Sequence, residues 1–189
     1  MKYSKKVRII ALIVFVASLS SAVFYSVSAR SNFQKTQSSI EELSEAEGVK
    51  VDLIRFSARD GTPMKALYYN SVDRLAYDNG STPLLIGCHG MSSDYLMFDN
   101  YAFTLAKTRG YAVFLIEARG HGSNPAPSTL GYLEGKDVVD LLDYIELNYP
   151  GINVSKSGVF GHSMGGLYAM SAYIEESLGK GRFKALVEG

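Results

Sequence analysis

A serine bracketed by glycines is the strongest chemical signal in this sequence. The run Gly161-His162-Ser163-Met164-Gly165 is followed directly by Gly166. An apolar stretch over residues 157–160 precedes the run, and good helix formers follow it. Side chains two positions before and after the serine would clash where a strand and a helix approach closely, so glycine suits both positions. The pattern predicts a nucleophile elbow, a sharp strand-to-helix turn that presents Ser163 as a nucleophile.

Two further glycine-flanked loops each follow an apolar run. His89-Gly90-Met91 comes directly after a run that ends at Cys88, and Arg119-Gly120-His121-Gly122-Ser123 comes shortly after a run that ends at Glu117. The carboxyl ends of parallel strands meet at one edge of a sheet, and ligands bind at that edge. We therefore expect both loops to converge on the serine turn.

The apolar periodicity around these loops indicates alternating strands and helices. Residues 51–56 and 64–69 alternate on either side of an Asp60-Gly61 turn and predict a hairpin. The elements expected after the hairpin are a strand over 83–88, a helix over 95–108, a strand over 111–117, a helix over 133–148, a strand over 157–160, a helix to 178 and a strand over 183–187. This order predicts an α/β fold with a mostly parallel sheet, helices on both faces and a leading antiparallel hairpin.

Charge and cysteine content exclude several classes of site. Positive and negative side chains balance, and no basic stripe suggests nucleic-acid binding. Cys88 is the only cysteine, which excludes an intramolecular disulfide and a cysteine-based metal cluster. We expect Cys88 to be a small core residue at a strand end. Neither a metal nor another cofactor is expected.

The first 29 residues differ from the rest of the chain. Residues 9–29 carry no charge, and four positive side chains precede the first apolar run: Lys2, Lys5, Lys6 and Arg8. A membrane anchor and a cleaved signal peptide both fit. The anchor is favoured because apolar residues continue past the first small-residue cleavage site, near Ala22. Either way the positive flank stays in the cytoplasm, which places the domain outside it. Residues 30–48 form a polar linker with a short helix expected near 39–43.

With these motifs in hand, residues 49–189 resemble the α/β-hydrolase family, in the branch of serine aminopeptidases, monoacylglycerol lipases and related esterases. The resemblance rests on the His89-Gly90 motif, the loop after Glu117 and the serine turn, which occur in the family's order. It implies an acyl-enzyme on Ser163 formed from a small acyl substrate. It also implies an oxyanion hole from the backbone N–H groups of Met91 and Met164. His89, Gly90, Gly161, Gly165 and Gly166 would then shape the site.

The sequence departs from this family where the base and acid should be. In this fold the triad follows the chain order serine, acid, histidine. After Ser163 the only acids are Glu175, Glu176 and Glu188, and no histidine follows. We expect Glu175 and Glu176 to be solvated and Glu188 to end the last strand, too early for the usual acid. His89 and His121 are expected to shape their loops, and His162 to be packed or bonded locally.

The economical interpretation of this departure is an incomplete α/β-hydrolase fold, truncated before the acid and histidine, with the 189-residue chain itself inactive. Under this interpretation the domain is a serine hydrolase that cleaves a carboxylic ester, or an amide or peptide bond. Two alternatives stay open: a non-catalytic hydrolase-like scaffold, and a non-hydrolytic acyl transfer on the same fold. On the helix over 133–148, four acids are expected to form a solvated face: Asp137, Asp140, Asp143 and Glu146.

Overall fold

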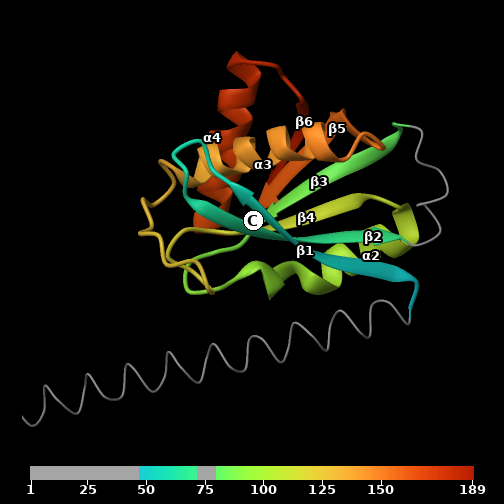
Figure 1. Cartoon of the computed structure of the whole chain (residues 1–189), viewed down its shortest axis with the longest axis horizontal. Coiled ribbons are helices and arrows are strands. Elements are labelled where there is room, and N and C mark those ends of the chain that lie inside the picture. Colours follow the sequence, from blue (N-terminus) through green and yellow to red (C-terminus); the bar gives the residue numbers. More distant parts are fainter. Residues whose placement is uncertain (1–46, 72–79) are drawn as a thin grey trace, which may run out of the picture. The chain divides into compact units, whose positions relative to one another are not determined.

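A six-stranded sheet forms the centre of the domain in a computed structural model that describes residues 47–71 and 80–189 (Figure 1). The strand order is β1-β2-β4-β3-β5-β6. The strands are β1 (Val49–Ser57), β2 (Pro63–Ser71), β3 (Thr82–Cys88), β4 (Ala112–Glu117), β5 (Ile152–Gly161) and β6 (Phe183–Glu188). β1 and β2 pair antiparallel, β2 pairs antiparallel with β4, and the remaining neighbours are parallel. The predicted α/β fold with a leading hairpin is confirmed.

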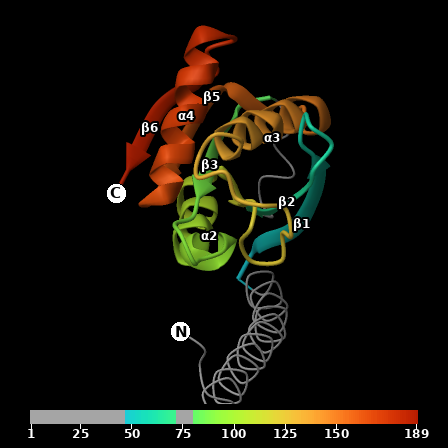
Figure 2. The ribbon, with the colours of Figure 1, turned by 90° about the vertical axis from the view of Figure 1, so that its left-hand side faces the viewer.

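Helices cover both faces of the sheet. α3 (Glu134–Asn148) and α4 (Met164–Leu178) pack together on one face, and α2 (Asp99–Arg109) lies on the other (Figures 1 and 2). The helix expected over 95–108 is divided in two. A short 3₁₀ helix, η2 (Tyr95–Phe98), begins where the Asp94 side chain accepts a hydrogen bond from the Leu96 N–H, and α2 follows. Gly110 ends α2 in the left-handed conformation, which glycine adopts without steric cost.

The core lies between the sheet and the α3–α4 layer. All six residues of β4 are buried, which fits a continuous apolar run in a strand covered on both faces. Val138, Leu141, Leu142 and Ile145 bury one side of α3. Cys88 is fully buried at the end of β3, as expected. The carboxyl ends of β3, β4 and β5 are thereby fixed relative to one another.

The predicted solvated face of α3 is wrong for two of its four acids. Asp137 is only 1% exposed, and its carboxylate accepts hydrogen bonds of 2.7 Å from both Nε and Nη2 of Arg119. Asp140 is largely buried under Arg59, whose backbone N–H and Nε bind it at 2.7 and 2.8 Å. Asp143 and Glu146 are exposed, as expected. The buried acids tie α3 to the β1–β2 turn and to the loop after β4.

Asp137→Ala is expected to lower the free energy of unfolding by about 3–5 kcal/mol, because it leaves the buried Arg119 guanidinium without its buried partner. Hydrogen bonds to Asp137 and Asp60 raise the pKa of Arg119, so the charge cannot be removed by deprotonation. Urea denaturation followed by circular dichroism measures the loss. Asp60→Ala is the matched control, since Asp60 binds the same guanidinium from an exposed position and should cost less. Equal losses for the two variants would contradict this account.

Glu176 is a second correction. We expected it to be solvated, but it is buried, and it accepts hydrogen bonds from the backbone N–H, Nε and Nη2 of Arg182. Bonds to Arg182 hold the pKa of Glu176 below its ordinary value. The pair closes the connection between α4 and β6, so Glu176 has a structural role. Its neighbour Glu175 is partly exposed and pairs with Arg59.

The predicted anchor or signal peptide (1–29), almost all of the linker (30–48) and the short helix near 39–43 lie outside the described residues. Within residues 47–71 and 80–189, no helix combines the length and apolar character needed to cross a bilayer.

Candidate active site

His162 and Ser163 form the two-residue turn between β5, which ends at Gly161, and α4, which begins at Met164. The backbone of Ser163 has φ 54° and ψ −119°, a conformation that non-glycine residues rarely adopt. Such strain persists only where surrounding structure enforces it, and it gathers at functional sites. The predicted sharp strand-to-helix turn is present.

The two glycines around Ser163 are required by backbone contacts. A Cβ added to Gly161 would lie closer than 3.0 Å to the backbone of Gly165 and Gly166. A Cβ added to Gly165 would meet the carbonyl groups of Cys88 and His89 just as closely. These contacts confirm the clash that the spacing implied, and they show that β3 is the element pressed against the turn.

The loop after β3 lies directly against the serine. A Cβ on Gly90 would lie 3.2 Å from the His162 carbonyl oxygen and 3.6 Å from Cβ of Ser163. Met91 follows Gly90 with an exposed side chain, whereas the side chain of Met164 is buried. The structure therefore brings together the two segments that carry the expected oxyanion donors.

His89 holds two of the converging loops together. It is 1% exposed, its Nδ1–H donates to the Gly90 carbonyl at 2.9 Å, and its Nε2 accepts the Ala118 N–H at 3.1 Å. Burial lowers the pKa of His89 to about 4, so the ring is neutral near pH 7. Through these two bonds His89 links the loop after β3 to the loop after β4.

The pKa of His89 predicts a loss of stability in acid. A histidine whose pKa is lower in the folded state stays neutral there at a pH at which the unfolded state already binds a proton. The contribution of neutral His89 to the free energy of unfolding is therefore intact above about pH 6.5 and is lost as the pH falls towards 4. We expect a loss of about 3 kcal/mol over this window. Denaturant unfolding at several pH values, compared with His89→Gln, isolates the effect, because glutamine keeps an acceptor for Ala118. Parallel pH profiles for the two proteins would count against it.

The other two histidines do not pair with the serine. His121 contacts the Arg119 carbonyl through Nδ1 at 2.8 Å, and its ring lies 5.2 Å from the ring of His89. It shapes its loop, as expected. His162 is exposed rather than packed. Among the described residues, no hydrogen bond joins the Ser163 hydroxyl to a histidine.

A buried carboxylate that we did not single out supports the loop after β4. Glu117 is fully buried and accepts hydrogen bonds from the N–H and Oγ of Ser123 at 3.1 and 2.9 Å. Lys65 donates to the same Oγ at 2.6 Å. Burial raises the pKa of Glu117, and Gly122 leaves room for its carboxylate. The only sequence signal was an acid at the end of an otherwise apolar strand.

β6 completes the surroundings of Ser163. The Ser163 N–H donates to the Gly189 carbonyl at 2.9 Å, and the Gly189 N–H donates to the Gly161 carbonyl at 3.2 Å. A small open cavity beside the turn is lined by Ser163, Gly166, Glu188 and Gly189. Glu188 does end the last strand, and its side chain faces this cavity.

Comparison with known proteins agrees with this geometry. A family profile described as serine aminopeptidase, S33, matches residues 81–187. An sn-1-specific diacylglycerol lipase, ABHD11, of Xenopus tropicalis is 28% identical over 127 residues, which cover 65% of this chain and 38% of that protein. A probable alcohol acetyltransferase of Saccharomyces cerevisiae is 33% identical over 109 residues, which cover 55% of this chain and 31% of that protein. The chain thus spans about a third of the length of these curated relatives.

Solved structures share the fold. An esterase of Pyrococcus furiosus, Pf2001, matches with a TM-score of 0.54 and 23% identity, covering 64% of this chain and 46% of that one. A hydrolase of Pseudomonas aeruginosa matches with a TM-score of 0.55 and 26% identity, covering 72% and 45%. The region that matches the family profile, residues 81–187, contains the strained serine turn and the loops after β3 and β4. The chain belongs to the serine aminopeptidase S33 family of α/β hydrolases.

Proposed function

We propose that Ser163 is the nucleophile of a serine hydrolase that cleaves a carboxylic ester, and secondarily an amide or peptide bond, through an acyl-enzyme. The strained backbone of Ser163, enforced by Gly161 and Gly165, is the observation that carries the proposal. Ser163 Oγ would attack the carbonyl carbon, and the backbone N–H groups of Met91 and Met164 would stabilise the resulting oxyanion. Each such donor is typically worth about 3–4 kcal/mol in the barrier.

The general base and its acid are proposed to come from sequence that continues after residue 189. A serine hydroxyl needs an adjacent base to take its proton. His89 has both ring nitrogens engaged, and His121 is bonded within its own loop. The proposal therefore treats residues 49–189 as a partial domain that is inactive by itself. The share of the curated relatives that this chain spans is consistent with this view.

Exposed apolar side chains near the serine support an acyl substrate. Leu167 lies one helical turn after Ser163, and a Cβ on Gly131 would lie 3.7 Å from Cβ of Leu167. On either side of Gly131, Leu130 and Tyr132 are also exposed. Apolar side chains gathered in this way suit the hydrocarbon part of an ester.

Acyl transfer to an alcohol is the second candidate, favoured by the yeast relative's name. Water and an alcohol would compete for the same acyl-enzyme. An assay with p-nitrophenyl esters, run with and without an alcohol, separates hydrolysis from acyl transfer. The assay uses a protein that extends past residue 189 in the same reading frame. Hydrolysis that Ser163→Ala abolishes supports the first proposal, and a new ester product supports the second. Absence of any Ser163-dependent turnover would overturn both and favour a scaffold.

We also propose that the apolar stretch over residues 9–29 anchors the protein in the membrane with the domain outside the cytoplasm, or directs its secretion after cleavage. The four positive charges before it favour this orientation. Added protease is expected to digest the domain while the cytoplasmic membrane is still intact. Protection that persists until the cytoplasmic membrane is lysed would place the domain in the cytoplasm.

A further inference from the structure

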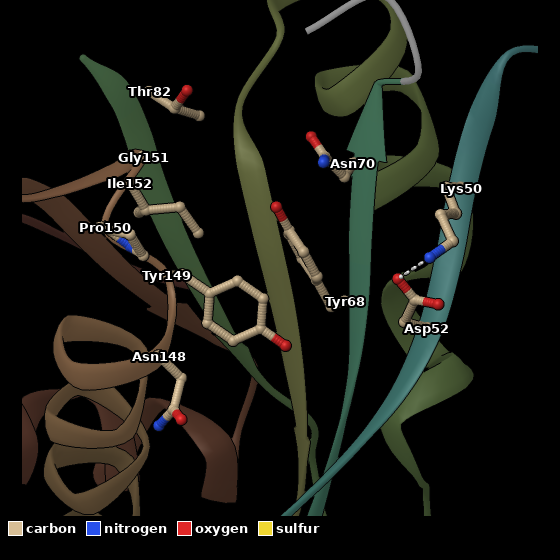
Figure 3. Close-up of a pocket in the computed structure, with 10 residues that line it drawn as sticks. All are labelled: Lys50, Asp52, Tyr68, Asn70, Thr82, Asn148, Tyr149, Pro150, Gly151 and Ile152. Atoms are coloured by element: carbon tan, nitrogen blue, oxygen red, sulfur yellow. Dashed lines mark ion pairs between the residues drawn. The ribbon is translucent and has the colours of Figure 1, made fainter. Parts of the chain in front are cut away.

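A second cavity, of about 240 Å³, lies at the opposite end of the sheet from Ser163. It is bordered by the starts of β1, β3 and β5, by the end of β2 and by the C-terminal end of α3 (Figure 3). The volume equals that of about eight water molecules and is smaller than a pocket for a drug-sized compound, ~300–1,000 Å³. It therefore suits a ligand of about one sugar ring in size.

Asn70 is the residue that points to a ligand. Asn70 is 8% exposed, and its side-chain amide is directed into the cavity from β2 (Figure 3). Within residues 47–71 and 80–189 this amide makes no hydrogen bond. An amide can donate two hydrogen bonds and accept two, and the atoms of this amide remain accessible to solvent through the open cavity. Asn70 therefore offers donors and an acceptor to whatever occupies the cavity.

The ring of Tyr149 packs on aromatic side chains of β2 and β4. The Tyr149 ring, at the end of α3, lies 5.2 Å from the ring of Tyr68 and 5.6 Å from that of Phe114, both edge-on. Tyr68 in turn stacks on Phe114 at 4.3 Å. Figure 3 shows the Tyr149 hydroxyl directed towards β1 and β2. Burial raises the pKa of Tyr149 to about 12, so this hydroxyl keeps its proton and can both donate and accept.

The charges at the cavity cancel. Lys50 Nζ and Asp52 Oδ2 lie 2.9 Å apart on β1, and both side chains are partly exposed (Figure 3). An anion attracted by Lys50 would meet Asp52, and a cation attracted by Asp52 would meet Lys50. A donor beside an acceptor instead matches a hydroxyl group, which offers one of each. An aromatic ring matches the C–H face of a pyranose.

We propose that this cavity binds a neutral polyhydroxy ligand, a monosaccharide unit, through Asn70, the Lys50–Asp52 pair and the ring of Tyr149. The site is separate from Ser163, so a sugar could be bound there whether or not a reaction takes place at the serine. This inference does not depend on the proposed hydrolase activity.

Titration of the full chain with glucose, galactose and N-acetylglucosamine, followed by NMR or calorimetry, tests the proposal. We use a Ser163→Ala background so that turnover cannot affect the signal. At least one neutral sugar should bind saturably, and Asn70→Ala should weaken it about tenfold, the loss of roughly one or two hydrogen bonds. Asn100→Ala, on the exposed surface of α2, is the matched control and should bind as the parent does.

Charged sugars complete the design. Glucuronate and glucosamine should bind more weakly than their neutral counterpart, because each brings a charge that the Lys50–Asp52 pair opposes on one side. No saturable binding of any neutral sugar, equal binding by Asn70→Ala, or preference for a charged sugar would each overturn the proposal. Circular dichroism of Asn70→Ala shows whether the variant is folded. If it is not, Lys50→Met, which alters an exposed residue, takes its place with the same expected weakening.

Discussion

Gly165→Ala is expected to destabilise the domain by more than about 3 kcal/mol, a large part of the 5–15 kcal/mol that stabilises a typical domain. The new methyl group would press on the carbonyl groups of Cys88 and His89. β3 cannot retreat, because it is hydrogen-bonded to β4 on one side and to β5 on the other. Thermal unfolding should show a midpoint lowered by about 10 °C, or the variant should be insoluble.

Gly166→Ala is the matched control for this prediction. It places the same methyl group one residue along α4, where the nearest atom, Cβ of Glu188, lies 3.4 Å away. Alanine is also the better helix former by up to about 1 kcal/mol, so the midpoint should stay within a few degrees or rise. If Gly165→Ala unfolded at the same temperature as Gly166→Ala, α4 could not approach β3 as closely as the structure shows.

The fold could be predicted because its signals are local. Alternating side chains predict β1 and β2, a continuous apolar run predicts β4, and glycine spacing predicts the turn at Ser163. The convergence of the loops follows from parallel strands alone. Gly90 does lie against Ser163, although the two residues are far apart in the sequence.

The buried ion pairs could not be predicted in the same way. Asp137 and Glu176 sit among helical acids that the sequence does not distinguish from solvated ones. Asp137 is buried only because Arg119, from the loop after β4, lies beside it. Glu176 is buried because the chain turns back at Arg182. Burial of a charge depends on a partner placed by the tertiary fold, so periodicity on one helix places these acids in solvent.

The reactivity of Ser163 is expected to differ by orders of magnitude between this chain and one that continues past residue 189. Under the proposal that the base lies after residue 189, only the proposed oxyanion hole and binding would contribute in this chain. Enzymes that lack triad residues retain roughly 10³–10⁴-fold acceleration over water, far below the intact enzyme. The strained turn presents the hydroxyl in both proteins, so a difference between them reports the missing proton acceptor rather than a misplaced serine.

Labelling with a fluorophosphonate probe tests this central claim most directly. The 189-residue chain, the extended protein and Ser163→Ala in each are compared for rate of labelling. The account predicts rapid labelling of the extended protein alone, abolished by Ser163→Ala. Rapid labelling of the 189-residue chain that depends on Ser163 would contradict it, because His89, His121 or His162 would then be acting as the base.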